Sequence, residues 1–154
     1  IMADYIKPVV FKVGELLYGV DINLVQSIEK QVSVVPVPNA TDYIKGIVNL
    51  RNEVIPLYSL KRKFKMKDEG YTGCSIIVNT GDVKLALEVD DVIEIGDINP
   101  ENMMKKPSII KNGSTRFMDR VAHIGKDLVV LMDVCQMLSD DEVDNLKKMT
   151  EELQ

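Results

Sequence analysis

The sequence has few residues from which an active site could be built. Its 154 residues include one histidine and two cysteines. Cys74 and Cys135 are far apart and show no C-x-x-C spacing, so we expect free thiols rather than a metal or redox site. Motifs for a nucleophile elbow, a phosphate loop, a zinc protease or a dinucleotide fold are absent. The sequence therefore predicts a protein that is not an enzyme and that uses no metal or cofactor.

The single histidine, His123, lies within an apolar run, where we expect a structural role rather than that of a general base. The adjacent acids Asp90 and Asp91 would point apart on a strand, so they do not form a catalytic pair. An alternative is a small β-barrel enzyme or ligand-binding protein, which would depend on His123 and Cys135. Substitution of His123 would abolish turnover or ligand binding in that case, and would otherwise affect only stability.

Long apolar runs and a positive net charge are also lacking. No apolar run approaches the ~20 residues that cross a bilayer, and no signal-peptide segment is seen, so we expect a cytoplasmic protein. The net charge is −5, from 19 basic and 24 acidic residues, which argues against nucleic-acid binding because that depends on neutralising phosphates. A local basic cluster is expected to be a solvated loop or short helix face; it comprises Lys61, Arg62, Lys63, Lys65 and Lys67.

Short β-branched runs separated by Gly, Asn, Asp and Pro dominate the chain and predict an all-β fold of small barrels. The expected strands are 9–13, 17–22, 47–50, 54–58, 75–79, 84–89, 121–124 and 128–133, with weaker ones at 26–29 and 92–95. A short connector helix is expected at 39–44. A C-terminal helix is expected to begin at a capping box formed by Ser139 and Glu142. Its apolar stripe is Val143, Leu146, Met149 and Leu153.

The chain also contains an internal duplication. Residues 11–28 align with residues 78–95 at a constant offset of 67. Residues 48–60 align with residues 122–134 at an offset of 74. We expect two copies of a five-stranded unit, each too small for a generous core, to bury apolar surface against each other.

Residues 46–60 form the most informative stretch. Two apolar segments flank the polar corner N-L-R-N-E, which predicts a β-hairpin with Arg51 at its tip and Asn52 at a position of positive φ. A guanidinium at such a tip is suited to binding a carboxylate or backbone carbonyls of a protein partner. In the second copy Gly125 stands in place of Arg51. Either a partner contact or divergence by drift would produce that difference.

This stretch resembles the signature of the CheW family, G-[VI]-x-N-L-R-G-x-[VI]-x-P-[VIL]-x-[DN]-L. The resemblance extends in order over nearly the whole chain, through the first hairpin (11–26), the connector (35–46) and a V-D-x-V segment (89–92). It implies an all-β fold of two SH3-like five-stranded β-barrel subdomains packed together, with a short connector helix and a C-terminal helix. It also implies that residues 1–154 are a single domain made of two interleaved lobes.

The resemblance implies a scaffold that links the cytoplasmic tips of chemoreceptors to the regulatory domain of the histidine kinase CheA. Contact with the membrane would be indirect, through the receptors. In that family the arginine of N-L-R and a V-x-[EQ]-[IV] segment lie in or near the binding surfaces. We therefore expect partner-binding residues in two segments, namely Asn49, Leu50, Arg51, Asn52 and Val54, and Val25, Ser27 and Ile28. The apolar residues would contribute binding energy and Arg51 specificity.

Four positions depart from the family pattern. Asn52 replaces the usual glycine, Ser59 a common aspartate and Ser27 a common glutamate, while Arg120 stands where glycine is usual. Ser27 and Arg120 leave open a specialised member that serves one receptor set or a pathway unrelated to motility. A further alternative is a regulatory module detached from a kinase or from a coupling–receiver fusion. The Met2 start and the helical C-terminal end favour a free-standing protein.

Overall fold

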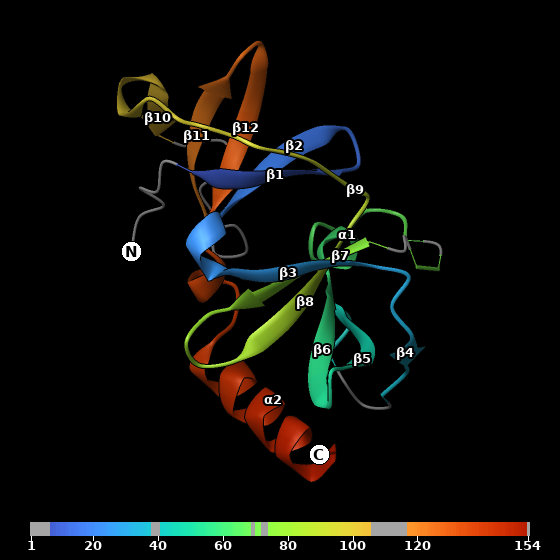
Figure 1. Ribbon diagram of the computed structural model, residues 1–154. Coiled ribbons are helices and arrows are strands. Elements are labelled where there is room, and N and C mark those ends of the chain that lie inside the picture. Colours follow the sequence, from blue (N-terminus) through green and yellow to red (C-terminus); the bar gives the residue numbers. More distant parts are fainter. Residues whose placement is uncertain (1–6, 38–40, 69, 72–73, 106–116, 154) are drawn as a thin grey trace.

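The computed structural model describes residues 7–37, 41–68, 70–71, 74–105 and 117–153, and its strands form two sheets (Figure 1). The first contains β1 (Pro8–Val13), β2 (Leu16–Asp21), β9 (Asp91–Ile95), β10 (Met103–Lys105), β11 (Met118–Ile124) and β12 (Asp127–Met132). The second contains β3 (Val25–Lys30), β4 (Val34–Val35), β5 (Ile44–Leu50), β6 (Glu53–Ser59), β7 (Cys74–Asn79) and β8 (Lys84–Val89). Helices are α1 (Leu60–Lys63) and α2 (Asp140–Leu153), with 3-10 turns η1 (Ile22–Leu24), η2 (Pro100–Asn102) and η5 (Val134–Gln136).

We call the first sheet and its surroundings lobe A and the second lobe B; lobe A is uppermost in Figure 1. The strand order is β10-β11-β12-β2-β1-β9 in lobe A and β3-β7-β8-β6-β5-β4 in lobe B. The predicted fold class is confirmed. Each sheet has six strands rather than the expected five, because the short strands β4 and β10 pair with β5 and β11.

The short helix lies elsewhere than predicted. Residues 39 and 40 fall outside the described residues, and the prediction is wrong for 41–44, where a turn leads into β5 at Ile44. Ile44 is buried and pairs with Tyr58, so tertiary burial outweighs the local helical tendency. The short helix is α1 instead, and its N-terminus is capped by Ser59, whose Oγ accepts a hydrogen bond from Arg62 N (3.2 Å).

The two sheets have the same pairing pattern, in keeping with the duplicated sequence. The antiparallel pair of Val25 and Val78 in lobe B matches, at the offset of 67, the pair of Val92 and Phe11 in lobe A. The parallel pairs β6–β8 and β12–β2 correspond in the same way. A copy of the repeat is nevertheless not a lobe. The first copy contributes β1 and β2 to lobe A and β3 to β6 to lobe B.

One hydrophobic core joins the lobes. A run of stacked aromatic rings links Phe11 to Tyr18, Tyr18 to Phe64 and Phe64 to Phe117, with ring centres 5.9, 5.1 and 5.9 Å apart. The same cluster contains buried residues of lobe B, among them Tyr58, Ile76 and Leu87. Because the lobes share this core, they hold a defined position relative to each other.

Helix α2 follows the last strand of lobe A and lies along the lower end of lobe B (Figure 1). The predicted capping box is confirmed: Ser139 N donates to Glu142 Oε1 (3.0 Å), and Glu142 N donates to Ser139 Oγ (3.2 Å). Leu146 is buried on the apolar face, whereas Leu153 near the end of the helix is exposed. Within the described part of the chain, no helix is long and apolar enough to cross a membrane.

Candidate partner-binding site

The β5–β6 hairpin has the predicted two-residue tip. Leu50 pairs with Glu53, which leaves Arg51 and Asn52 as the turn, at φ 49° and 68°. Positive φ at both central residues is the requirement of a type I′ turn, whose twist matches that of the flanking strands. The sequence predicted the positive φ of Asn52 but not that of Arg51. A two-residue turn of type I′ requires positive φ at both central residues, so the turn length was the available signal for Arg51. Such a backbone is unusual for arginine and is found where the surrounding structure imposes it.

The hairpin tip is joined to β3. Arg51 Nη2 lies 3.5 Å from Glu29 Oε2, and the two side chains are 67% and 19% exposed. β3 lies at one edge of the lobe B sheet and β5 near the other, so this ion pair spans the sheet where it curls round. The structure thus brings together the two segments predicted to bind a partner.

The other predicted residues of the hairpin divide into exposed and supporting groups. Asn49 and Asn52 are exposed beside Arg51. Leu50 is half-buried and Val54 is 8% exposed. Val54 therefore supports the tip from within the fold.

The residues predicted on β3 alternate between its two faces, as strand geometry requires. Ile28 is exposed (41%), whereas Val25 is half-buried against the shared core. Ser27 Oγ is buried with no hydrogen-bond partner among the described residues. Glu29, two residues further along the same face, escaped prediction. Its position on the face of Val25 and Ser27 was the available signal.

A buried charged cluster supports this hairpin from inside lobe B. Lys45 Nζ on β5 contacts Asp68 Oδ1 (2.9 Å) and Glu88 Oε1 on β8 (2.5 Å), and also donates to the Gly70 carbonyl. The side chains of Lys45, Asp68 and Glu88 are 2–5% exposed. Buried charges are stable only when paired, so this cluster ties the segment after α1 to the sheet.

Asp68 has further partners in that cluster. Ser59 Oγ donates to it (3.0 Å), and Arg62 Nε lies 3.2 Å from it. Burial by itself would raise the pKa of Asp68, but the hydrogen bonds from Lys45 and Ser59 and the charges of Lys45 and Arg62 outweigh it and lower the pKa below the ordinary 3.8. Ser59, a departure from the family pattern, thus both caps α1 and binds Asp68.

Asp90 of the V-D-x-V segment connects the lobes where the chain passes from β8 to β9. Its carboxylate accepts a hydrogen bond from Gly14 N in the β1–β2 turn (2.7 Å) and lies 2.8 Å from Lys61 Nζ on α1. The hydrogen bond that Lys61 donates to Asp90 raises the pKa of Lys61. Asp90 therefore joins lobe A to α1.

Four further residues were singled out in the sequence: His123, Arg120, Cys74 and Cys135. His123 lies on β11 and is exposed, so it is not part of the core. Arg120 lies beside an irregularity in the pairing of β11 with β12 and is half-buried. Cys74 and Cys135 form no disulfide in the described part of the chain. No cluster of three potential metal ligands occurs among the residues that the structure describes.

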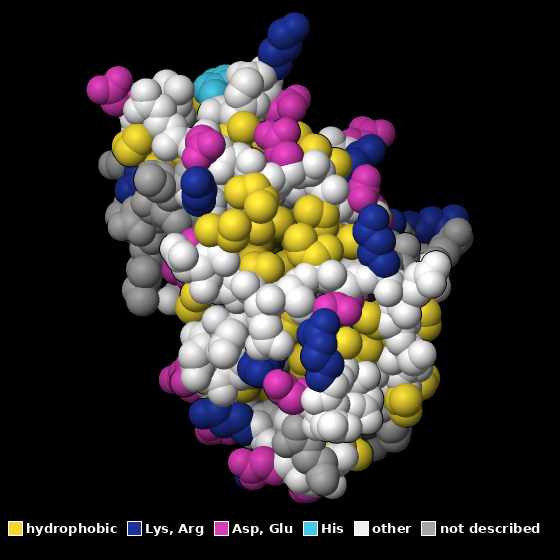
Figure 2. Space-filling view, in the orientation of Figure 1, with side chains coloured by type: hydrophobic (Ala, Val, Ile, Leu, Met, Phe, Trp, Pro, Cys, Tyr) yellow, Lys and Arg dark blue, Asp and Glu magenta, His cyan; other side chains and the backbone are white. Residues whose placement is uncertain are grey.

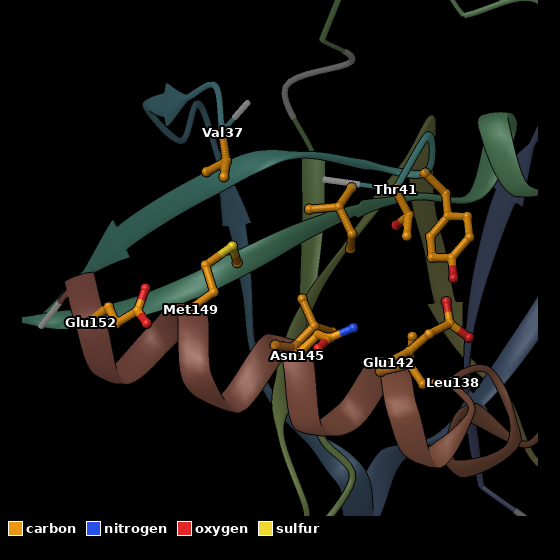
Figure 3. Close-up of a pocket in the computed structure, with 10 residues that line it drawn as sticks. Val37, Thr41, Leu138, Glu142, Asn145, Met149 and Glu152 are labelled. Carbon is orange, nitrogen blue, oxygen red and sulfur yellow. The ribbon is translucent and has the colours of Figure 1, made fainter. Parts of the chain in front are cut away.

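A cavity of about 360 Å³ lies between α2 on one side and β5 with the residues that precede β5 on the other (Figure 3). It is lined by Val37, Thr41, Tyr43, Ile44, Leu138, Glu142, Asn145, Leu146, Met149 and Glu152. Figure 3 shows Met149 and Glu142 directed from the helix toward the strands. Glu142 is held in the helix cap by Ser139, and Glu152, Asn145 and Thr41 also line the cavity, so its lining is partly apolar and partly polar.

Comparison with known proteins agrees with this arrangement. A family model described as CheW-like domain matches residues 7–142. The protein named Chemotaxis protein CheW from Treponema pallidum is 30% identical over 147 residues, covering 92% of this chain and 86% of its own length. The protein of the same name from Klebsiella aerogenes is 28% identical, covering 90% of this chain and 87% of its own length.

A solved structure agrees as well. The scaffolding protein TtCheW from Thermoanaerobacter tengcongensis superimposes with a TM-score of 0.76 at 31% sequence identity, covering 84% of this chain and 89% of that protein. The match by sequence and the match by structure each extend over both lobes. The chain therefore belongs to the CheW-like domain family.

Proposed function

We propose that this chain is a non-enzymatic adaptor that couples chemoreceptors to the histidine kinase CheA, and that residues 1–154 act as one domain. Its partners are the cytoplasmic tip of the receptor and the regulatory domain of the kinase. The family membership and the names of the relatives support the coupling role. The choice of site rests on Arg51. Its side chain is exposed and its backbone has positive φ in the two-residue turn of the β5–β6 hairpin. Lobe B, which carries this hairpin, is stabilised by the buried Lys45 cluster.

The proposed receptor contact lies where the lobes meet. Figure 2 shows apolar side chains gathered in the middle of one face, between β1 above and β3 below. Ile28 on β3 and Ile95 on β9 are among the exposed large apolar residues, at 41% and 58%. Exposed apolar surface of this kind fits the apolar face of a helical hairpin, which the receptor would supply.

Binding energy in such an interface comes from a few apolar anchors, while charged groups set orientation. Ile28 is the anchor that β3 presents to solvent, and Arg51 is the charged group. Association with the membrane follows from binding to receptors. No bond is made or broken, because the adaptor works by holding two partners at a fixed separation.

The decisive experiment measures binding of the purified protein to a kinase regulatory domain and, separately, to a receptor-tip fragment, with and without Arg51→Ala. We expect micromolar or tighter binding, and a loss of about tenfold or more on substitution for the partner that contacts the hairpin. The free energy of unfolding should be unchanged within about 0.5 kcal/mol, as for other exposed sites.

Lys126→Ala is the matched control, since Lys126 is an exposed cation at the tip of the corresponding β11–β12 hairpin. It should leave binding through the Arg51 hairpin intact. Binding to neither partner would refute the coupling role and leave only the fold. Equal losses for both variants would show that net charge, rather than the hairpin, determines binding.

A further inference from the structure

Strand β9 contributes apolar residues to the proposed receptor contact but has little packing of its own. Ile93 and Ile95 are 48% and 58% exposed, and Val92 is half-buried against the shared core. β9 lies at the edge of the lobe A sheet, so among the described strands it pairs only with β1. That pairing shifts register between Val10 and Phe11. Burial of side chains therefore does little to fix the position of β9.

The residue just before β9, Asp90, has a carboxylate that contacts both lobes. Its Oδ2 accepts a hydrogen bond from Gly14 N in the β1–β2 turn of lobe A (2.7 Å). Its Oδ1 lies 2.8 Å from Lys61 Nζ on α1, the helix that follows β6 of lobe B. The backbone adds a third contact, because Asp90 N donates to the Lys12 carbonyl on β1 (2.9 Å). Figure 1 shows β9 in this position, between α1 and β1.

The two side-chain contacts need a group with two acceptor oxygens. In a carboxylate one oxygen can accept from the backbone N–H while the other pairs with the cation. An amide has one acceptor oxygen, and its NH₂ group would place a donor against either Gly14 N or Lys61 Nζ. The side chains of Asp90 and Lys61 are 25% and 24% exposed, so water competes for this ion pair less than it does for a fully exposed one.

The duplicated fold provides an internal comparison for Asp90. At the offset of 67, β3 corresponds to β9 and Asn23 corresponds to Asp90. Gly81 corresponds to Gly14, but its N–H donates to Asn79 Oδ1 within its own hairpin (2.9 Å). Asn23 is exposed in the 3-10 turn η1. The bridging carboxylate therefore belongs to the crossing that leads into β9 rather than to the repeated fold.

We propose that Asp90 is a positioning residue for the receptor contact. By joining α1 to the β1–β2 turn it fixes the start of β9, and with it the position of Ile95 relative to Ile28 on β3. The proposal rests on the proposed function for its partner, the apolar face of a helical hairpin at the chemoreceptor tip. Ordering a loose edge strand at the moment of binding would reduce affinity. A strand that is already held presents its apolar residues without that cost.

The first test needs no partner. Amide hydrogen exchange followed by NMR reports local opening of β9, including Gly96 N, which donates to the Pro8 carbonyl (2.8 Å). Asp90→Asn should speed exchange of these amides about tenfold more than that of β7 in lobe B. Asp91→Asn, the same loss of charge at an exposed neighbour, should have no effect. An unchanged β9, or an equal change in β7 and β9, would overturn the proposal, the latter by showing that Asp90 serves overall stability alone.

The second test measures binding of a purified chemoreceptor-tip fragment by isothermal titration. Asp90→Asn and Lys61→Met should each weaken binding about three- to tenfold, and the double variant should bind no more weakly than either, because both changes break the same bridge. Lys61→Arg keeps a cation beside Asp90 and should bind within about twofold of wild type. Additive losses in the double variant would overturn the proposal, since the two residues would then act separately.

A change at the contact itself shows whether Asp90 acts through β9. Ile95→Ala removes an apolar side chain that Asp90 is proposed to position, so on this background Asp90→Asn should lose most of its effect on receptor binding. An undiminished effect would overturn the proposal, because Asp90 would then act elsewhere than through β9. If the wild-type protein fails to bind the receptor tip, the proposed function is refuted, while the exchange test still decides whether Asp90 holds β9.

Discussion

The hairpins β5–β6 and β11–β12 both close with a two-residue turn, but the turns differ: both central residues, Arg51 and Asn52, have positive φ in the first, and only Gly125 does in the second. Leu50 pairs with Glu53 at the end of the first, and Ile124 pairs with Asp127 at the end of the second. The first residue of the turn has φ 49° in Arg51 and φ 62° in Gly125. Glycine adopts this conformation without strain, whereas arginine does not.

The difference shows that the fold does not require an arginine at this turn. Lobe A makes the turn with glycine, and lobe B makes it with a residue that is strained there. Arg51 also has an acidic partner, Glu29, whose counterpart Gly96 has no side chain. The comparison therefore separates what the turn needs from what a binding surface needs.

The largest expected effect tests whether the lobes behave as one unit. Phe11 of β1 is fully buried in the core that both lobes share. Phe11→Ala should reduce the free energy of unfolding by about 3–5 kcal/mol, because a large cavity remains in a packed interior. Urea titration followed by circular dichroism measures the loss.

Hydrogen exchange then shows where the loss falls. Amides of β7 in lobe B and of β2 in lobe A should lose protection together if the shared core makes unfolding cooperative. A loss confined to lobe A would mean that the lobes unfold separately, and the comparison would have to treat them as two domains.

A smaller effect concerns the charged cluster of lobe B. Because the pKa of Asp68 is lowered in the folded protein, its carboxylate stabilises the fold above about pH 4. That contribution is lost as the pH falls through the folded pKa. Asp68→Asn should cost about 1–3 kcal/mol at pH 7, as expected for hydrogen bonds to charged groups.

The difference between wild type and Asp68→Asn should shrink as the pH is lowered from 5 to below 3. Chemical denaturation of both proteins at each pH measures it. A difference that stays constant over this range would show that the carboxylate is not ionised in the folded state. Glu94→Gln, an exposed change in lobe A, should show neither the loss nor the pH dependence.

The smallest effect comes from transferring the arginine to the other lobe. Gly125→Arg should destabilise the protein by about 1 kcal/mol, because a side chain is forced into positive φ where glycine was free. No atom lies within 4 Å of a Cβ at this position, so a steric clash adds nothing.

The double variant Gly125→Arg/Arg51→Ala has its only hairpin-tip arginine on β11–β12. We expect this variant not to bind the partner, because lobe A has no residue equivalent to Glu29. Isothermal titration with the receptor-tip fragment measures this. Restored binding would show that any arginine at such a tip is sufficient, and would remove the distinction between the lobes.

Local patterns predicted much of this structure. Alternation and turn residues located the strands, the polar corner located the hairpin of Arg51 and Asn52, and the spacing of Ser139 and Glu142 located the start of α2. Each of these depends on neighbours within a few residues, so the sequence alone contains the signal.

The contacts that escaped prediction join distant segments. Lys45 meets Asp68 and Glu88, which lie 23 and 43 residues further along the chain. Glu29 meets Arg51 only because the sheet of lobe B curls. No local periodicity signals such pairs. The prediction of a connector helix at 39–44 was wrong for a related reason. Ile44 belongs to β5 because it pairs with Tyr58, and a local pattern does not reveal that partner.

The exchange of strands between the two halves has a consequence for synthesis. Lobe B is one continuous stretch, from β3 to β8, whereas lobe A needs β1 and β2 from the start of the chain and β12 from near its end. Leu17 pairs with Val129, 112 residues later. At ~5–20 residues per second, roughly 6–22 s separate the synthesis of Leu17 from that of Val129. β1 can pair with β9 earlier, but the other edge of the first hairpin, β2, stays without its strand partner until β12 has been made.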